Sequence, residues 1–109
     1  MTISELSTAV DYKINTITIV MNNKSWGAEK AYQKDFFGKR YIGADINSPS
    51  FDKVAQLYGA NGFNVNKVTE INEVLKAALE YNKPAVINVN IDPKALYSFR
   101  RDSFKHRTK

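Results

Sequence analysis

The spacing of apolar residues predicts helices that alternate with strands along the chain. Ile3, Leu6, Val10 and Ile14 recur at helical intervals and predict an amphipathic helix over residues 3–13. The β-branched run that follows predicts a buried strand over residues 16–21. Near the other end, apolar and polar residues alternate over residues 85–91, which is the clearest strand pattern in the sequence.

The middle of the chain predicts further elements with start and stop signals. Residues 28–33 favour a short helix by propensity, and the glycines after them predict a loop over residues 38–48. A second helix is expected to begin with Ser48 as its cap and Pro49 in its first turn. Its apolar face is Phe51, Val54, Ala55 and Tyr58, and Gly59 ends it.

A short strand over residues 63–65 and one more helix complete the pattern. Thr69 is predicted to cap this helix, whose apolar stripe comprises Ile71, Val74, Leu75 and Ala78. Strands that alternate with helices predict an α/β fold, a parallel sheet with helices on both faces. Three strands make a small sheet for that architecture, so we expect the chain to be part of a larger domain.

Composition limits the class of protein. The 109 residues are 43% hydrophobic, with six Phe, six Tyr and one Trp, which is typical of a globular domain. No apolar run approaches the roughly 20 residues that span a bilayer, and residues 1–5 do not resemble a signal peptide. The absence of cysteine excludes disulfides and thiolate metal sites and agrees with a cytoplasmic location, which we expect.

The net charge of +5 is unevenly distributed. One basic cluster comprises Lys24, Lys30, Lys34, Lys39 and Arg40; a second comprises Lys94, Arg100, Arg101, Lys105, Arg107 and Lys109. Such clusters attract anions, either a small anionic substrate or nucleic-acid phosphate. The alternative is a solvated face and a frayed tail, which is the more common origin of a modest excess of charge.

Two consecutive carboxamides, Asn22 and Asn23, follow the strand predicted at residues 16–21. They stand where an open α/β sheet holds its ligands, at the carboxyl end of a strand. One interpretation is a polar turn, since Asn is a common turn residue. The other is a ligand or cation site, because amide oxygens suit hard cations.

The sequence offers no catalytic residue. His106 lies in a polar tail without a partner cluster, and no nucleophile elbow or glycine-rich phosphate loop occurs. Asp45, Asp52 and Asp92 are scattered and form no assignable acid–base pair. Aromatic residues are interleaved with the lysines of residues 24–40, which permits base stacking, but we interpret them as buried; they are Trp26, Tyr32, Phe36, Phe37 and Tyr41.

Several segments resemble the C-terminal domain of thiamine-diphosphate-dependent enzymes. The resemblance rests on residues 5–10, the apolar strand, the Asn22–Asn23 pair with Trp26 and Gly27, and on residues 51–60 and 84–93. It implies a partial thiamine-diphosphate-binding fold with thiamine diphosphate and Mg²⁺ as cofactors. By resemblance, Asn23 would bind Mg²⁺ through its side-chain oxygen and Ser25 through its backbone carbonyl, while Asn22 and Trp26 would line the neighbouring turn.

Within this family, residues 26–30, Gln33, residues 35–37, Arg40 and residues 99–102 resemble the sulfoacetaldehyde acetyltransferase subfamily. That resemblance implies a small anionic substrate and phosphate, which yield acetyl phosphate and sulfite. Acetolactate synthase and related decarboxylases share the general features and remain the alternative.

The chain also departs from the family pattern. It contains no Gly-Asp-Gly, the motif that supplies an aspartate to Mg²⁺, and the activating glutamate belongs to a separate N-terminal domain. We therefore expect residues 1–93 to be a partial domain and residues 94–109 a basic tail, inactive alone and dependent on the N-terminal part of the same enzyme. The full-length enzyme is expected to be a homo-oligomer. Two alternatives are a non-catalytic module that pairs with a separate N-terminal partner or with itself, and a nucleic-acid binder.

Overall fold

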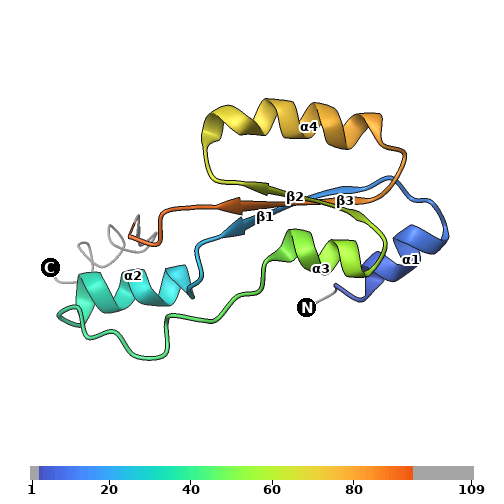
Figure 1. The fold of residues 1–109 in the computed structure, drawn as a ribbon. Coiled ribbons are helices and arrows are strands. Elements are labelled where there is room, and N and C mark those ends of the chain that lie inside the picture. Colours follow the sequence, from blue (N-terminus) through green and yellow to red (C-terminus); the bar gives the residue numbers. More distant parts are fainter. Residues whose placement is uncertain (1–2, 95–109) are drawn as a thin grey trace, which may run out of the picture. The chain divides into compact units, whose positions relative to one another are not determined.

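The computed structural model describes residues 3–94. It divides into two compact units, one containing residues 3–22 and 49–91 and the other centred on residues 23–48. Within the first unit the order is α1 (Glu5–Asp11), β1 (Ile17–Asn22), α3 (Phe51–Leu57), β2 (Asn61–Val65), a 3₁₀ turn at Val68–Glu70, α4 (Ile71–Glu80) and β3 (Ala85–Asn90) (Figure 1). The second unit contains α2 (Gly27–Phe36).

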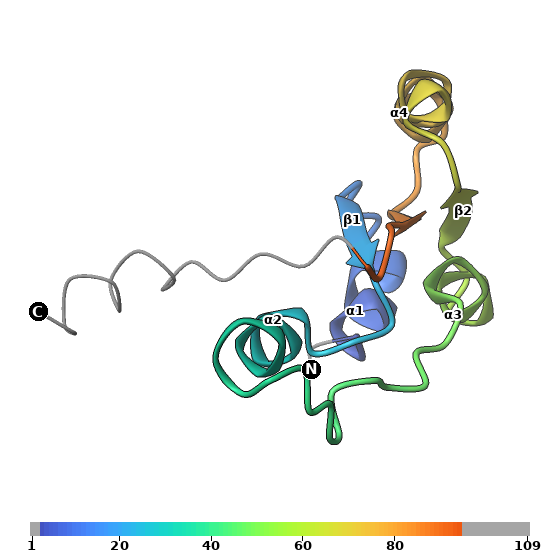
Figure 2. The ribbon, with the colours of Figure 1, turned by 90° about the vertical axis from the view of Figure 1, so that its left-hand side faces the viewer.

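The three strands form a parallel sheet in the order β1–β3–β2, so β3 lies in the centre. Ile17 of β1 and Asn61 of β2 both pair with Ala85, and Asn22 pairs with Asn90 at the other end. Helix α4 covers one face of the sheet, and α1 and α3 lie on the opposite face (Figures 1 and 2). The predicted α/β class, a parallel sheet with helices on both faces, is therefore confirmed.

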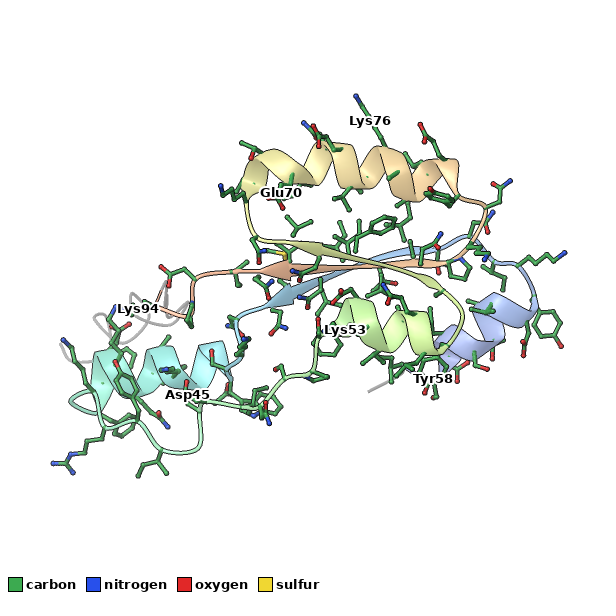
Figure 3. All side chains as sticks on the ribbon, viewed as in Figure 1. Asp45, Lys53, Tyr58, Glu70, Lys76 and Lys94 are labelled. Carbon is green, nitrogen blue, oxygen red and sulfur yellow. The ribbon has the colours of Figure 1, made fainter. Side chains whose placement is uncertain are left out.

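Each face of the sheet has its own apolar core. On the α4 side, the buried residues Val65, Ala85, Ile87 and Val89 pack with the stripe predicted for the last helix, Ile71, Val74, Leu75 and Ala78. On the opposite side, Ala55, Ala60 and Val86 are buried against Leu6, Val10, Val20 and Phe51. Lys76 points away from the sheet, as the amphipathic pattern requires (Figure 3). Burial of a side chain such as Ile87 is worth roughly 2 kcal/mol.

Both predicted helix caps are wrong. Helix α3 begins at Phe51 with Ser50 at the cap position, two residues later than expected. The Ser50 hydroxyl donates to the Asp52 carboxylate and does not cap the backbone. An extended residue before proline can cap a helix, but here the first backbone bonds run from the Lys53 and Val54 N–H groups to the Ser50 carbonyl, so the helix starts at Phe51 and not directly after Ser48. Thr69 lies inside the 3₁₀ turn, and Glu70 occupies the cap position of α4. The Glu70 carboxylate accepts a hydrogen bond from the backbone N–H of Asn66 at 3.3 Å.

The other boundaries agree with the sequence pattern. Gly59 has a φ of +84° directly after α3, the left-handed conformation that ends helices. The loop predicted over residues 38–48 is confirmed, apart from a bridge between Ser25 and Asp45. The division into residues 1–93 and 94–109 stays a prediction, because residues 95–109 lie outside the described residues. No helix in the described range is long and apolar enough to cross a membrane.

Helix α3 crosses β2 so closely that only glycine fits beneath it. A Cβ atom on Gly62 would lie 1.9 Å from the Asp52 backbone oxygen and 2.6 Å from its carbonyl carbon. We predict that Gly62→Ala destabilises the fold by about 3 kcal/mol or more, because a rigid helix backbone must move. Urea denaturation of the full chain measures this change.

Gly43→Ala is the control for that experiment. Gly43 has a φ of +61°, but a methyl group added there would have no neighbouring atom within 4 Å, so the expected cost is only the backbone strain of about 1 kcal/mol. Equal losses of stability for the two variants would contradict the close approach of α3 to β2.

Candidate functional site

The segment after β1 is a tight turn held by the side chain of Asn23. The Asn23 Oδ1 atom accepts the Ser25 backbone N–H at 3.1 Å. Lys24, between them, has a φ of +54°, a conformation that non-glycine residues rarely adopt. This arrangement is an Asx turn, in which an Asn side chain replaces a backbone carbonyl. The turn interpretation of the sequence is therefore correct, and whether the turn also binds a ligand depends on its remaining oxygens.

Ser25 is fixed by a bridge to the loop that returns from α2. The Trp26 N–H donates to the Ala44 carbonyl at 2.6 Å, and the Ile46 N–H donates to the Lys24 carbonyl at 3.0 Å. In this antiparallel pattern the residue between the two bonds directs its own N–H and C=O away from the paired segment. The Ser25 N–H points at Asn23 Oδ1, so its carbonyl faces the same side as the Asn23 amide.

Two more features surround this pair of oxygens. The Ser25 side chain is 9% exposed, and its buried hydroxyl has no hydrogen-bond partner within the described residues. Gly27 leaves space beside Asn23, since a Cβ on Gly27 would lie 2.7 Å from Asn23 Nδ2. A buried polar atom without a partner is costly. The turn thus presents two neutral oxygen atoms that can act as metal ligands, and beside them a hydroxyl without a hydrogen-bond partner. Such ligands fit Mg²⁺ whose other ligands are phosphate oxygens and water.

Helix α2 begins directly after this turn. Its first residue is Gly27, with Trp26 at the cap position and 59% exposed. The first N–H groups of a helix carry partial positive charge and attract anions. Glu29 in the first turn opposes this attraction, so α2 alone does not define an anion site.

Asn22, the last residue of β1, belongs to a different arrangement within the first unit. It is 6% exposed, and its Nδ2 donates to Asn88 Oδ1 at 3.1 Å. Asn88, only 2% exposed, donates through Nδ2 to Asn64 Oδ1 at 2.8 Å and Asn90 Oδ1 at 3.2 Å. Asn90 Nδ2 in turn donates to Asn64 Oδ1 at 2.9 Å and Asn66 Oδ1 at 2.8 Å.

This asparagine network joins the carboxyl ends of all three strands on one face of the sheet. Asn88 is its centre, because it accepts from β1 and donates to β2. The bond to Asn88 also fixes the orientation of the Asn22 amide, since the nitrogen must face Asn88. Sequence reasoning overlooked the network, although Asn64 and Asn66 at the end of β2, like Asn88 and Asn90 in β3, stand two residues apart, a spacing that places side chains on one face.

One residue of the first basic cluster, Lys30, makes contacts within its own unit. Lys30 Nζ lies 2.5 Å from Asp45 Oδ1 and 5.3 Å from the centre of the Tyr41 ring. Gln33 holds the same loop, donating to the Ile42 carbonyl at 3.0 Å and accepting the Ile42 N–H at 3.2 Å. Asp45 lies on the loop after α2 (Figure 3). Lys30 and Gln33 therefore stabilise this loop.

The expected burial of the aromatic residues near this cluster is wrong. Trp26 is 59% exposed, Phe37 63% and Tyr41 44%, while Tyr32 and Phe36 contact each other with ring centres 5.4 Å apart. Among the described residues, one ten-residue helix and the loop after it are too small to bury so many large rings.

Other candidate groups give no alternative site. Among residues 3–94, no three His, Cys, Asp or Glu side chains come together where they could hold a metal. Asp45 pairs with Lys30, and Asp52 pairs with Ser50. His106 and the second basic cluster, except Lys94, lie outside the described residues.

Residues 1–89 match the family model of the C-terminal TPP-binding domain of thiamine pyrophosphate enzymes. The chain therefore belongs to this family, and the predicted resemblance is confirmed.

The individual relatives carry different activities in their names. Sulfoacetaldehyde acetyltransferase of Castellaniella defragrans is 33% identical over 107 residues, which cover 94% of this chain and 18% of that protein. A probable acetolactate synthase large subunit of Methanococcus aeolicus is 31% identical over 99 residues, 90% of this chain and 16% of that protein. The chain thus spans less than a fifth of the length of these relatives.

A solved structure supports the same assignment. The thiamine diphosphate-dependent 4-hydroxybenzoylformate decarboxylase of Rhodococcus jostii RHA1 aligns with a TM-score of 0.72 at 29% identity, over 84% of this chain and 18% of that one. The matched family model describes the TPP-binding domain of thiamine pyrophosphate enzymes, and the activities in the names of the relatives differ.

The centre of the asparagine network is expected to be sensitive to substitution. Asn88→Leu would remove the hydrogen bonds that Asn88 makes with the side chains of Asn22, Asn64 and Asn90. We predict a loss of about 2–3 kcal/mol in the free energy of unfolding, measured by urea denaturation. Asn66→Ala is the matched control at the exposed end of the network, with an expected loss below about 0.5 kcal/mol. A neutral Asn88→Leu variant would show that the network contributes little.

The space beside Asn23 gives a second prediction. Gly27→Ala should displace the Asn23 amide, because the new methyl group would lie 2.7 Å from Nδ2 and the side chain can move away only by giving up its hydrogen bond to the Ser25 N–H. Helix α2 itself should tolerate the change, since Ala favours helices over Gly by about 1 kcal/mol. NMR would detect loss of the Asn23–Ser25 hydrogen bond as a shift of the Ser25 amide. Gly38→Ala, with nothing within 4 Å, should leave that amide unchanged; the same shift in both variants would contradict the prediction.

Proposed function

We propose that this chain supplies the magnesium-binding turn of a thiamine-diphosphate-dependent enzyme that converts sulfoacetaldehyde and phosphate into acetyl phosphate and sulfite. The observation that carries the proposal is the turn itself. Asn23 Oδ1 and the Ser25 carbonyl face the same side of the second unit, as a shared cation requires. The resemblance to the family implies the same two residues as ligands.

Neutral ligands suit the chemistry of this site. Mg²⁺ prefers six oxygens in octahedral geometry and commonly binds phosphate oxygens and water beside a few protein ligands. An amide and a carbonyl hold the cation without adding negative charge next to a diphosphate. The unsatisfied Ser25 hydroxyl and the start of α2 offer further hydrogen-bond donors for an anion at this place.

Thiamine diphosphate supplies the carbanion stabilisation in enzymes of this type, and the protein binds and orients it. This chain's part is to hold the Mg²⁺–diphosphate group. Asn22 and Trp26 are proposed to line the neighbouring turn, Trp26 with its largely exposed indole.

The ligand set in this chain is incomplete. It has no Gly-Asp-Gly motif to add an acidic ligand, and no residue of the described part offers a catalytic acid–base pair. We infer that the chain alone is inactive and that activity requires the N-terminal part of the same enzyme. The full-length enzyme is proposed to act as a homo-oligomer in the cytoplasm.

Sulfoacetaldehyde acetyltransferase is preferred over the alternatives for two reasons. Relatives with that name share 33% and 32% identity over 94% of the chain. The substrate and phosphate are both anions, and Lys24, Lys34, Lys39 and Arg40 give the second unit a positive excess. Lys30 and Gln33 stabilise the loop after α2. Their part in the resemblance to the subfamily is therefore no argument for the choice of substrate.

An acetolactate synthase or a decarboxylase is the second candidate, because relatives and a solved structure with those names are almost as similar. The two candidates differ in substrate, since acetolactate synthesis begins from 2-oxo acids and not from a sulfonated aldehyde. A chimera distinguishes them, in which this chain replaces the matched region of the Castellaniella defragrans enzyme.

We expect the chimera to bind thiamine diphosphate only with Mg²⁺ and to release sulfite from sulfoacetaldehyde, whereas the chain alone shows no micromolar binding by calorimetry. Asn23→Ala should weaken Mg²⁺ binding by at least about tenfold, because it removes a ligand. Ser25→Ala should retain the Mg²⁺ affinity, because the backbone carbonyl remains.

The controls separate the parts of the proposal. Turnover of pyruvate without sulfite release would favour the second candidate. Unchanged Mg²⁺ affinity in Asn23→Ala would reject the ligand assignment, and micromolar binding of thiamine diphosphate by the isolated chain would reject the view that it is incomplete.

A further inference from the structure

Strand β2 begins with Asn61 and Gly62, which form the one Asn-Gly pair in the sequence. In an unfolded chain such a pair can modify itself, because glycine has no side chain to shield its backbone nitrogen from the amide that precedes it. The nitrogen attacks the side-chain carbonyl carbon of the asparagine and displaces the amide group as ammonia. In the folded chain, this reaction depends on the conformation and the surroundings of the two residues.

Glycine at position 62 is required by the packing of the fold. A Cβ atom there would lie 1.9 Å from the backbone oxygen of Asp52 in α3. A bulkier residue, which would shield the nitrogen, is therefore excluded at this position. The reactive pair is thus a consequence of the close approach of α3 to β2.

The fold holds Asn61 through its main chain. The Asn61 N–H donates to the Pro84 carbonyl at 2.9 Å, and the residue pairs with Ala85 of β3. Its side chain is half-buried, and the buried Nδ2 atom has no hydrogen-bond partner within the described residues. Loss of this amide group would therefore break none of the described hydrogen bonds.

The strand conformation keeps the reacting atoms apart. A residue in a parallel strand has a ψ of about +115°, which rotates the next nitrogen away from its own Cβ atom. Ring closure needs the opposite arrangement, in which the Gly62 nitrogen turns toward the side chain of Asn61. That rotation changes the direction of the strand, so it cannot occur while Asn61 and Phe63 pair with β3.

Opening of β2 requires the loss of a single ladder. In the sheet formed by residues 3–94, β2 pairs with β3 alone, over five residues. The ladder between β1 and β3 can remain intact while β2 separates. Local openings of this kind need less free energy than global unfolding.

We propose that Asn61 is a site of spontaneous deamidation, which the pairing of β2 with β3 prevents and the opening of β2 permits. The Gly62 nitrogen forms a bond to Cγ of Asn61 and loses its proton, while Nδ2 leaves as ammonia. The product is a cyclic imide, which water then opens at either of its two carbonyl groups. The net reaction consumes water and releases ammonia, and no atom is oxidised or reduced.

Neither product fits the original place of Asn61. Opening at one carbonyl gives aspartate, whose charge would be buried where Nδ2 now has no partner. Opening at the other gives isoaspartate, which carries the main chain through the former side chain and so lengthens the backbone. The rest of β2 then shifts relative to β3, including Asn64 of the asparagine network. The reaction therefore makes the opening of β2 irreversible.

The test compares deamidation rates in the folded full chain and in the chain unfolded by urea, at the same neutral pH and temperature. Peptide mapping by mass spectrometry follows the conversion of amide to acid at Asn61 and, as an internal control, at Asn47. Asn47 precedes Ser48 in the loop after α2, where it is exposed and outside any helix or strand. We expect Asn61 to react at least about tenfold more slowly in the folded chain, whereas the rate at Asn47 changes less than about threefold.

Two outcomes would overturn the proposal. Equal rates at Asn61 in the folded and unfolded chain would show that pairing with β3 gives no protection. Absence of reaction in urea would show that the pair is not labile. Below the urea midpoint, the rate at Asn61 should also rise with urea concentration while the rate at Asn47 stays constant, and a constant rate at Asn61 would exclude strand opening as the requirement.

Asn61→Gln is the control for assignment, because the tryptic peptide with Asn61 also contains Asn64 and Asn66. The longer glutamine side chain closes such a ring far more slowly, so the acid form of this peptide should not accumulate in urea. Accumulation at the wild-type rate would mean that another asparagine reacts and that the proposal is wrong.

A second pair of variants tests the consequence of the reaction. Asn61→Asp reproduces one product and should lower the melting temperature at pH 7 by about 4 °C or more, because it buries a carboxylate without a partner. Asn47→Asp makes the same change at an exposed residue and should alter the melting temperature by less than about 2 °C. Equal melting temperatures would contradict the expected incompatibility of the product with the fold. None of these readouts requires thiamine diphosphate or Mg²⁺, so they are independent of the proposed function.

Discussion

Pairing of β3 with both neighbouring strands is the constraint on which the first unit depends. Among the strands that residues 3–94 form, only β3 has a partner on each side, and its register sets Asn22 opposite Asn90. A slip of one residue would exchange the two faces of β1 and remove Asn22 from the asparagine network. Because the turn at residues 23–25 follows Asn22 directly, the same register determines where that turn begins.

The asparagine network adds a constraint from polar side chains to the backbone pairing of the strands. Leucine at position 88 would bury as much surface but would not distinguish one register from another. A buried amide is tolerated only where its partners are in place, so each misaligned strand carries a cost. The network therefore strengthens the pairing that places Asn22 at the carboxyl end of the sheet.

Periodicity was sufficient to predict most of the fold. The strand at residues 85–91 and the stripe of Ile71, Val74, Leu75 and Ala78 follow from local spacing, and the structure has both. The caps at Ser48 and Thr69 were not predictable in this way, since several hydroxyl and carboxylate groups compete near each helix start. The predicted burial of Trp26 and Phe37 was wrong, because their neighbours depend on tertiary contacts that local spacing does not reveal; both rings are exposed among the described residues.

The candidate site was predictable only to the level of the turn. Asn23 and Ser25 were identified through a resemblance, and spacing alone left a turn and a ligand site as equal possibilities. The role of Gly27 depends on the space beside it, where an added Cβ would lie 2.7 Å from Asn23 Nδ2, and no sequence pattern encodes that approach. Asn88 lies 66 residues from Asn22, and such a contact requires the sheet topology.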